Sequence, residues 1–428
     1  MEILILVITF VLLLVLGVPV AWCIGVSSLL TMMVSIESLP AMTTVAQRMA
    51  TGLDSFALLA IPFFVLAGQI MNRGGIAQRL VDFARTLVGA LPGGLAHVNV
   101  IAAMLFGAIA GSAAAAASAI GGFMTKAMTD EGYSREFSAA VNITASTTGL
   151  VIPPSNVLIV YSLASGGVSI AALFLAGYLP GILTGLALTI AAGIWAKRKG
   201  YARGKRSSLR EVFSTFVSAF PGLLLLVVVI GGIVAGIFTA TEASAVAVLY
   251  CLILTAIYRE ISWKDLPQIF LSSVGTTAIV MLLIGASMSM SWIMAYENIP
   301  QSITDLLLSV SDNKIVVLLL INMILLFVGI FMDMTPAVLI FTPIFLPVVT
   351  ELGMSPIHFG IMMVLNLCIG LCTPPVGSIL FVGVGVAGTT IQKVIRPLLL
   401  FFVAMIISLI LVTFIPALSL WLPSVFGF

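Results

Sequence analysis

The sequence predicts an all-helical protein that crosses a lipid bilayer many times, and three observations support this fold class. Only 8% of the 428 residues are charged, whereas 61% are hydrophobic. Soluble domains carry about 25% charged residues, so this chain has too little charge to cover a water-facing surface. The charges are also unevenly placed and leave long apolar stretches. These stretches are continuous rather than alternating, which excludes a transmembrane β-barrel.

Long runs without Asp, Glu, Lys or Arg divide the chain. A bilayer core needs about 20 apolar residues for each helical crossing, so several runs are expected to hold more than one crossing. The N-terminal sequence has neither the basic leader nor the small-residue cleavage site of a signal peptide. The first run is therefore expected to be a retained membrane span. The runs are 3–36, 55–72, 86–125, 137–196, 212–241, 266–296, 315–332, 352–392 and 397–428.

Charge and residue usage exclude several classes of function. The formal net charge of +2 argues against nucleic acid as a partner. The cysteines all lie in apolar stretches, which predicts packing rather than a disulfide framework. Neither histidine has a second metal ligand beside it, so a catalytic or metal-binding histidine is not expected. These residues are Cys23, Cys251, Cys368, Cys372, His97 and His358.

Basic residues cluster once, near the middle of the chain. The stretch from Lys197 to Arg210 holds seven of the 18 Lys and Arg residues. The positive-inside tendency predicts that 197–211 is a cytoplasmic loop. This loop separates a first half, 1–196, from a second half, 212–428.

The two halves resemble each other at a constant offset of 221 residues. GLVIPP at 149–154 matches GLCTPP at 370–375, and Ser112 falls on Asp333. Each half therefore places a polar residue in an apolar helix and a double proline 41 positions later. Two such arrangements in equivalent places indicate an internal repeat.

A double proline breaks a helix, because it removes backbone donors and clashes with the preceding turn. Broken backbone persists in a membrane only where it is buried in protein or lines a wet cavity. Secondary transporters use paired broken helices, whose carbonyls bind cations and whose helix N-termini attract anions. We therefore predict broken helices at 149–156 and 370–378. The Gly/Ala/Ser-rich stretch 107–125 predicts a re-entrant hairpin after one span within 86–125, with a counterpart near 329–350.

Asp333 is the strongest single candidate for a functional residue. It stands between the charge-free segments 315–332 and 334–350, where a carboxylate is costly and marks an ion or proton pathway. The alternative is an aspartate that caps the turn at Thr335 and Pro336. Sodium fits either half of the repeat, because it accepts carboxylate, hydroxyl and backbone carbonyl oxygens.

Other polar residues have simpler interpretations. Glu242 is the second acid flanked by apolar sequence, and we favour a helix-start glutamate there. Asp54 and Ser55 are expected to cap the start of a span. Ser155 and Asn156 follow the first double proline and offer donors for a carboxylate ligand.

Six segments in order resemble the large membrane subunit of tripartite ATP-independent periplasmic (TRAP) transporters, over about 50–395. They are LDSFALLAIPFFVLAGQIMNRGGIAQRL, the GSAAAAASAIGG stretch, TTGLVIPPSN, GIFTATEASAVAVLY, FMDMTPAVLIFTPIFLPVV and LNLCIGLCTPPVG. The resemblance implies about eleven transmembrane helices and two re-entrant hairpins in two inverted repeats. It also implies an elevator-type movement coupled to sodium. Typical members show proline where this chain has Ala240.

The resemblance also implies site residues. The first sodium site would use Ser112 and the backbone of Gly149, Ile152 and Pro154. The second would use Asp333, Thr373 and the backbone of Gly329, Gly370 and Pro375. Substrate contacts are expected from Ser155, Asn156, Thr335 and Gly377. Two or more sodium ions, and no organic cofactor, are expected.

The function that follows is sodium-coupled uptake of an organic acid anion, of the sialic acid or C4-dicarboxylate class, across a bacterial inner membrane. The family implies a small four-helix membrane subunit and a soluble periplasmic substrate-binding protein as separate polypeptides. The alternative is a sodium/carboxylate symporter of the wider ion-transporter group that needs no binding protein. An intramembrane enzyme is disfavoured because Asp333 has no catalytic partner in the sequence. A channel is disfavoured by the repeat and by the absence of a charged ring.

Overall fold

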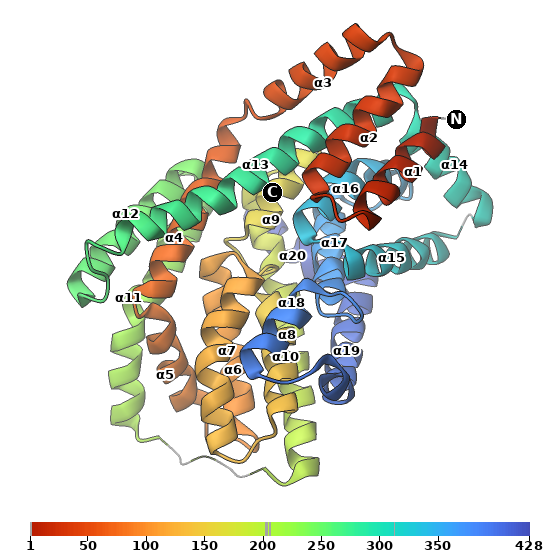
Figure 1. Cartoon of the computed structure of the whole chain (residues 1–428). Helices are drawn as coiled ribbons and strands as arrows, with labels where there is room; N and C mark the ends of the chain where they lie inside the picture. The colour runs from red at the N-terminus through yellow and green to blue at the C-terminus, as the bar shows by residue number, and fades with distance from the viewer. Residues whose placement is uncertain (1, 202–203, 205–206, 312) are drawn as a thin grey trace.

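The computed structural model describes residues 2–201, 204, 207–311 and 313–428, and within them the chain is helical without a β-strand (Figure 1). Eight helices in this part of the chain are long and apolar enough to cross a membrane, and shorter apolar helices accompany them. The predicted all-helical, multi-pass fold class is confirmed.

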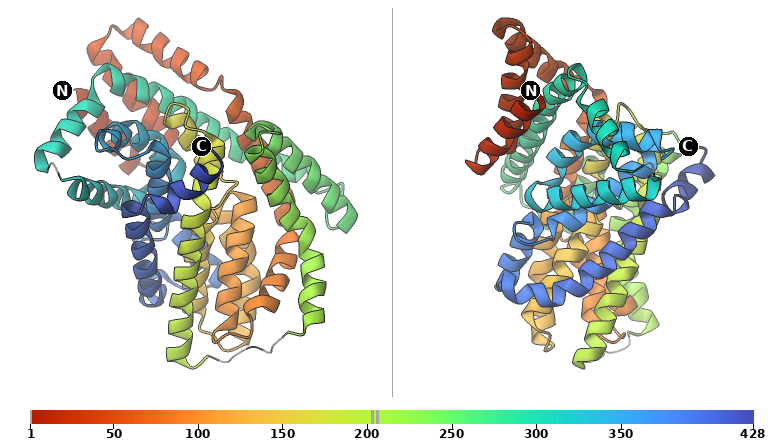
Figure 2. Two further views of the ribbon diagram at one scale, coloured as in Figure 1. Left: turned by 180° about the vertical axis from the view of Figure 1, so that it is seen from behind. Right: turned by 90° about the vertical axis from the view of Figure 1, so that its right-hand side faces the viewer.

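One group of helices forms an elongated layer, which we call the arm. Within it α4 packs against α12 and α13, and α13 also packs against α2 and α3. Both views of Figure 2 show α1 to α3 standing off from the remaining helices at one end, whereas α13 also packs against helices outside this layer. The arm consists of α1 (Glu2–Val15), α2 (Val20–Ser35), α3 (Ser38–Gly52), the 3-10 helix η1 (Phe56–Leu59), α4 (Ala60–Arg73), α5 (Ile76–Val88), α11 (Leu209–Val234), α12 (Ala240–Tyr258) and α13 (Leu266–Tyr296).

The remaining helices form a compact bundle beside the arm, which we call the core. It is built from helices of both halves of the chain. They are α6 (Gly94–Ala110), α7 (Ala113–Asp130), α8 (Arg135–Thr148), α9 (Asn156–Ala164), α10 (Ile170–Lys199), α14 (Ile299–Val310), α15 (Lys314–Phe331), α16 (Met334–Glu351), α17 (Pro356–Leu371), α18 (Ser378–Ala387), α19 (Ile391–Phe414) and α20 (Ala417–Val425).

Two helical hairpins lie in the core. Helices α6 and α7 pack together and meet at Gly111 and Ser112, and α15 and α16 meet at Met332 and Asp333. The first hairpin is therefore longer than predicted. No complete span precedes it within 86–125, so that prediction is wrong. The charge-free run holds the end of the short, amphipathic α5 and then most of both hairpin arms.

Both double prolines lie in connections between helices. The first connects α8 with α9, the second connects α17 with α18, and both Pro–Pro bonds are cis. Beyond each break the chain packs against the hairpin of the other half: α9 contacts α16, and α18 contacts α7. This reciprocal contact is the arrangement that two related halves would produce.

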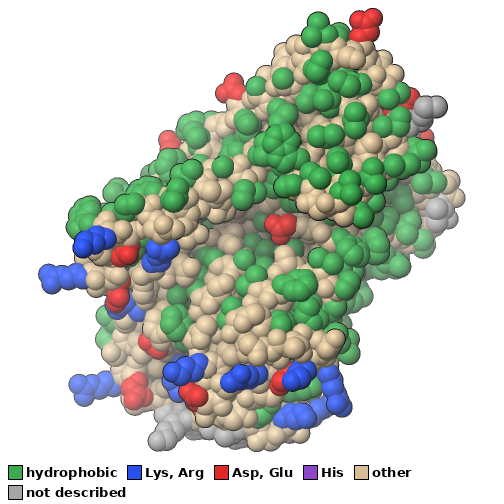
Figure 3. All heavy atoms as spheres, in the orientation of Figure 1, with side chains coloured by type: hydrophobic (Ala, Val, Ile, Leu, Met, Phe, Trp, Pro, Cys, Tyr) green, Lys and Arg blue, Asp and Glu red, His purple; other side chains and the backbone are tan. Residues whose placement is uncertain are grey.

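The charged residues lie toward the ends of the molecule. Figure 3 shows hydrophobic side chains over the upper and middle parts of this face, Lys and Arg in its lower half, and one acidic side chain in the hollow at its centre. Lys197, Arg198 and Lys199 form the last turn of α10 at this end. The predicted basic loop continues from there, and its residues 202–203 and 205–206 lie outside the described residues.

The structure tests the two capping predictions. The Glu242 carboxylate accepts hydrogen bonds from the backbone N–H of Thr239 at 2.8 Å and from its hydroxyl at 2.9 Å, so the helix-start interpretation is confirmed. Ala240 occupies the first position of α12, where proline is also favoured. The Asp54 and Ser55 prediction is wrong, because Ser55 precedes η1 without a side-chain capping bond.

Buried cysteines and histidines serve packing. All four cysteines are free and buried. His97 Nε2 lies 3.0 Å from the carbonyl oxygen of Pro92, and His358 Nε2 lies 2.6 Å from that of Val412. Both rings are therefore held by backbone. In the described residues no three His, Cys, Asp or Glu side chains gather into a metal-binding group.

Candidate functional site

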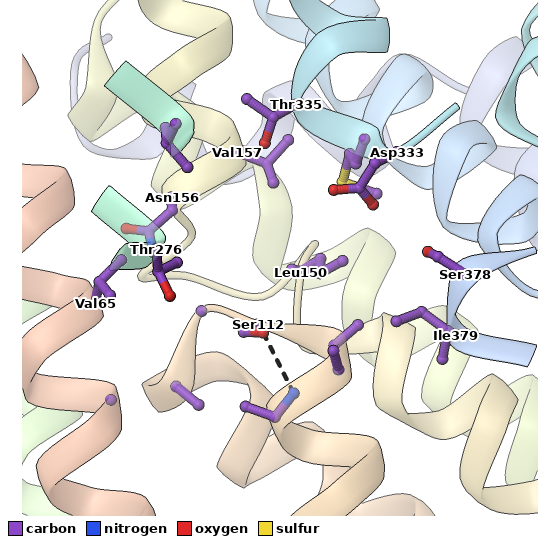
Figure 4. A pocket seen from close by; sticks show the side chains of 18 of the residues that line it. Val65, Ser112, Leu150, Asn156, Val157, Thr276, Asp333, Thr335, Ser378 and Ile379 are labelled. Atoms are coloured by element: carbon purple, nitrogen blue, oxygen red, sulfur yellow. Dashed lines mark hydrogen bonds between the residues drawn. The ribbon is translucent and has the colours of Figure 1, made fainter. Parts of the chain in front are cut away.

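A cavity of about 380 Å³ lies where the two hairpin tips and the two helix breaks meet the arm (Figure 4). Helices α4 and α13 form its arm side. Apolar side chains make up much of the wall, and polar side chains from both halves project among them. The polar lining residues are Gln69, Asn72, Ser112, Asn156, Thr276, Asp333, Thr335 and Ser378.

The first hairpin tip is shaped by two residues. Gly111 has a φ of +60°, and a Cβ there would lie 3.0 Å from Asn156 Nδ2. Only glycine fits such a left-handed turn without strain against a neighbour. Ser112 follows in extended conformation, and its Oγ accepts a hydrogen bond from the backbone N–H of Ala115 at 3.3 Å. The half-buried Ser112 hydroxyl therefore lies at the hairpin tip, at the start of α7.

The second tip carries Asp333 at the equivalent place. Asp333 occupies the N-cap position of α16 but makes no side-chain capping hydrogen bond, so the capping alternative is not what the structure shows. Its side chain is exposed at the cavity, on the same side as Ser378, while Thr335 projects from the first turn of α16. No Lys, Arg or His is among the described residues that line the cavity. The carboxylate therefore faces the cavity without a cationic side chain beside it.

Glycines let each hairpin touch its neighbouring broken helix backbone to backbone. A Cβ at Gly149 would lie 2.3 Å from the Cα of Gly107, and one at Gly370 would lie 2.6 Å from the Cα of Gly329. Any larger residue would push the helices apart. Three of these glycines, Gly149, Gly329 and Gly370, are predicted sodium-site residues, and the structure places them at these contacts behind the cavity lining.

The other predicted sodium-site residues lie in the two breaks. Ile152 is buried against Gly181 of α10. Pro154 faces α4, α11 and α12 of the arm. Thr373 is half-buried and donates its hydroxyl to the carbonyl oxygen of Ile369 at 2.7 Å. Pro375 is exposed. The structure thus brings Ser112 and Asp333 to the cavity, whereas the remaining seven are not among its lining residues.

The predicted substrate residues divide in the same way. Asn156 and Thr335 line the cavity. Ser155 is buried and donates its hydroxyl to the carbonyl oxygen of Leu150 at 2.6 Å, so that hydroxyl is already used. Gly377 is buried immediately before α18. A Cβ there would lie 2.7 Å from the carbonyl oxygen of Leu371 and 2.9 Å from that of Thr373.

Sequence reasoning missed four polar lining residues. Ser378 directly follows the predicted Gly377. Gln69 and Asn72 on α4, and Thr276 on α13, lie in runs treated only as spans. In the sequence these residues stand out as uncharged polar side chains inside otherwise apolar segments. The sequence does not show which face of each helix points toward the core, because that depends on tertiary packing.

Comparisons with known proteins agree with this architecture. The chain matches the family model described as "Tripartite ATP-independent periplasmic transporter, DctM component" over residues 7–418. It is 56% identical over 419 residues to the uncharacterized protein YgiK of Salmonella typhimurium, covering 98% of this chain and 96% of the relative.

Relatives with named substrates are also similar over nearly their whole length. The C4-dicarboxylate TRAP transporter large permease protein DctM of Rhodobacter capsulatus is 38% identical, with 96% of each chain covered. The sialic acid TRAP transporter large permease protein SiaM of Vibrio cholerae is 41% identical, with 89% of each chain covered. Among solved structures, the Alcanivorax borkumensis YdaH transporter shares the fold with a TM-score of 0.63 at 15% identity, with 88% of each chain covered.

The family match over almost the whole chain and the all-helical architecture lead to the same conclusion. This chain belongs to the DctM family of TRAP transporter large permeases, and it is a multi-pass membrane transporter protein rather than an enzyme.

Proposed function

We propose that this chain imports an organic acid anion by sodium-coupled secondary active transport. Relatives of 38% and 41% identity are named for C4-dicarboxylate and for sialic acid, which supports this class of substrate. The anion would bind in the cavity between the hairpin tips, and sodium would bind at the tips and the helix breaks.

The chemistry of the cavity lining carries this proposal. Asp333 is exposed there, and the described lining residues include no Lys, Arg or His. Two negative charges in a cavity of low dielectric constant repel each other strongly. A bound sodium ion would neutralise Asp333 and make the anion's entry favourable, because a bound cation is the largest local charge in such a site.

The two tips and breaks supply suitable oxygen ligands. In the first half we assign Ser112 with the carbonyls of Gly149, Ile152 and Pro154. In the second half we assign Asp333 and Thr373 with the carbonyls of Gly329, Gly370 and Pro375. Helix breaks free backbone carbonyls for cation binding, which supports this assignment.

The anion itself needs hydrogen-bond donors. Asn156 and Thr335 line the cavity and can donate to a carboxylate. The hydroxyl of Ser155 is already used, so we assign Ser155 and Gly377 roles through their backbone N–H groups, which precede α9 and α18.

The position of the cavity supports movement of the core along the arm. Its walls come from α4 and α13 on one side and from the core on the other. Sliding the core past these two helices would carry the cavity across the membrane, which is an elevator-type movement. A small four-helix membrane subunit and a periplasmic substrate-binding protein complete the proposed transporter.

Uptake by proteoliposomes tests the proposal. The chain is reconstituted with its small membrane subunit, and the binding protein is added with labelled succinate or N-acetylneuraminate. We expect uptake that requires an inward sodium gradient and the binding protein. Uptake that persists without sodium would refute the coupling. Sodium-dependent uptake without the binding protein would instead support the simpler sodium/carboxylate symporter.

A further inference from the structure

Helix α4 turns one continuous stripe toward the cavity. Its lining residues are spaced as one face of a helix and change along the helix from apolar to amide side chains. They are Ile61, Val65, Gly68, Gln69 and Asn72. At Gly68 the arm touches the first hairpin, because a Cβ there would lie 2.7 Å from the carbonyl oxygen of Ala110. The two amides therefore lie on the arm next to a hairpin tip.

The Gln69 and Asn72 amides have no hydrogen-bond partner within the described part of the chain. Both side chains are half-buried, on a helix apolar enough to cross the membrane. Each amide offers two N–H donors and one acceptor that face the cavity and are free to bind its occupant. A polar group inside the cavity would satisfy them.

A third amide also lacks a partner in this cavity. The Oδ1 atom of Asn156 is buried without a hydrogen bond. Figure 4 shows Asn156 beside Thr276 and Val65, whereas Asp333 and Ser378 lie on the opposite side of the cavity. The cavity thus has a neutral side rich in donors, formed with the arm, and an acidic side formed by the core.

We infer that Gln69 and Asn72 form a subsite on the arm that binds a carboxylate of the transported anion. This inference rests on the proposed function and adds specificity-determining residues to it. The anion's carboxylate would accept hydrogen bonds from the two amides, at a distance from Asp333. Neutral amides bind a carboxylate less tightly than Arg or Lys, which suits a ligand that must be released.

The location of the subsite on the arm has a mechanistic consequence. The anion would contact α4 only while the first hairpin tip lies against it, as it does in this structure. Affinity would then differ between this conformation and one in which the core has moved away, because a ligand favours the state that it contacts better. The two amides would therefore raise the affinity for the anion only in the conformation in which the cavity lies against α4.

Substitutions in the reconstituted transporter test this subsite. Gln69→Glu and Asn72→Asp keep the size of the side chain and replace donors with a negative charge, while Gln69→Leu and Asn72→Leu remove the donors without adding charge. Gln47→Glu, at an exposed position of α3 away from the cavity, is the matched control. Uptake of succinate and of N-acetylneuraminate is measured against anion and sodium concentration.

We expect each acidic variant to raise the KM for the carried anion about tenfold or more, and each leucine variant about threefold to tenfold. At saturating anion, the sodium concentration for half-maximal uptake by the leucine variants should stay within about twofold of wild type, because the proposed sodium ligands are untouched. The control should match wild type. A fold defect would instead lower the maximal rate, because fewer transporters are active, and leave both dependences unchanged.

Thiol labelling gives a second measurement. The four native cysteines are buried, so an Asn72→Cys variant should provide the main reactive thiol in the cavity. The anion that the wild-type complex carries should slow its alkylation. Wild-type KM values in all four variants, or alkylation unaffected by that anion, would overturn the inference and leave the proposed function intact. A wild-type complex that shows no sodium-dependent uptake of any organic acid anion would overturn both.

Discussion

In the hairpin of α6 and α7, the tip residue Ser112 accepts a hydrogen bond from the N–H of Ala115 at 3.3 Å, whereas the equivalent Asp333 of the second hairpin makes no side-chain capping bond. The first side chain is therefore partly used to hold its own helix. The second is exposed to the cavity, where its carboxylate interacts with the Ser378 hydroxyl and the backbone N–H of Met334. Two similar backbones thus present a neutral tip and an acidic tip, so under the proposed sodium coupling the second tip would supply the charge.

The largest expected effect comes from removing that charge. Asp333→Ala should abolish sodium-driven uptake, because the proposed second sodium site would lose its only anionic ligand. Uptake in proteoliposomes measures this, and a wild-type elution profile and melting temperature would show that the variant is folded. Near-normal uptake by this variant would refute the role assigned to Asp333.

The next largest effect, a loss of stability, is expected from substituting the glycines that contact each other behind the hairpin tips. Gly149→Ala and Gly370→Ala place a Cβ 2.3 Å and 2.6 Å from backbone carbon atoms of Gly107 and Gly329. Overpacking of this kind should lower the free energy of unfolding by about 1–3 kcal/mol, with Gly149→Ala the more damaging. Thermal unfolding in detergent measures the loss. Gly122→Ala, where no atom lies within 4 Å, is the control, and equal stability of all three variants would contradict the backbone contact.

A smaller change is expected at the first tip. Ser112→Ala should raise the sodium concentration for half-maximal uptake about two- to tenfold, because one neutral oxygen ligand is lost. Ser169 caps α10 with the same geometry, accepting from Ala172 N–H at 3.3 Å, but it does not line the cavity. Ser169→Ala should therefore leave the sodium dependence unchanged. If both variants shift it equally, the effect is loss of a cap rather than of a ligand.

The smallest effect should come from the other acid within an apolar stretch. Glu242 completes a capping box with Thr239 at the start of α12. Glu242→Ala should lower the melting temperature only slightly, because an exposed cap is lost, and leave sodium dependence at the wild-type value. If Glu242→Ala lost sodium coupling, Glu242 would also take part in sodium binding, and Asp333 would not be its sole acidic ligand.

Fold class and helix breaks were predictable from the sequence because they depend on local chemistry. Continuous apolar runs predict spans, and a double proline stops a helix in any surroundings. Ser112 and Asp333 could be paired because the repeat preserves their offset. The extent of the first hairpin was not predictable, since a charge-free run such as 86–125 does not mark where one helix turns back on the next.

The part of the site that the arm supplies was also missed. Gln69, Asn72 and Thr276 line the cavity only because α4 and α13 turn those faces toward the core. That orientation depends on contacts between helices far apart in the sequence. The Asp54 and Ser55 cap failed for a related reason, because a capping motif does not determine where the loop directs its side chains.

Sodium binding at the second tip is the central claim, and the thermal stability of the purified complex tests it without a substrate. A ligand that binds the folded state raises its melting temperature. We predict that the wild-type complex melts at a higher temperature in sodium chloride than in potassium chloride at equal ionic strength. Asp333→Asn should lose the larger part of this difference and Ser112→Ala the smaller part. Equal melting temperatures in the two salts for wild type, or a full difference retained by Asp333→Asn, would contradict the account.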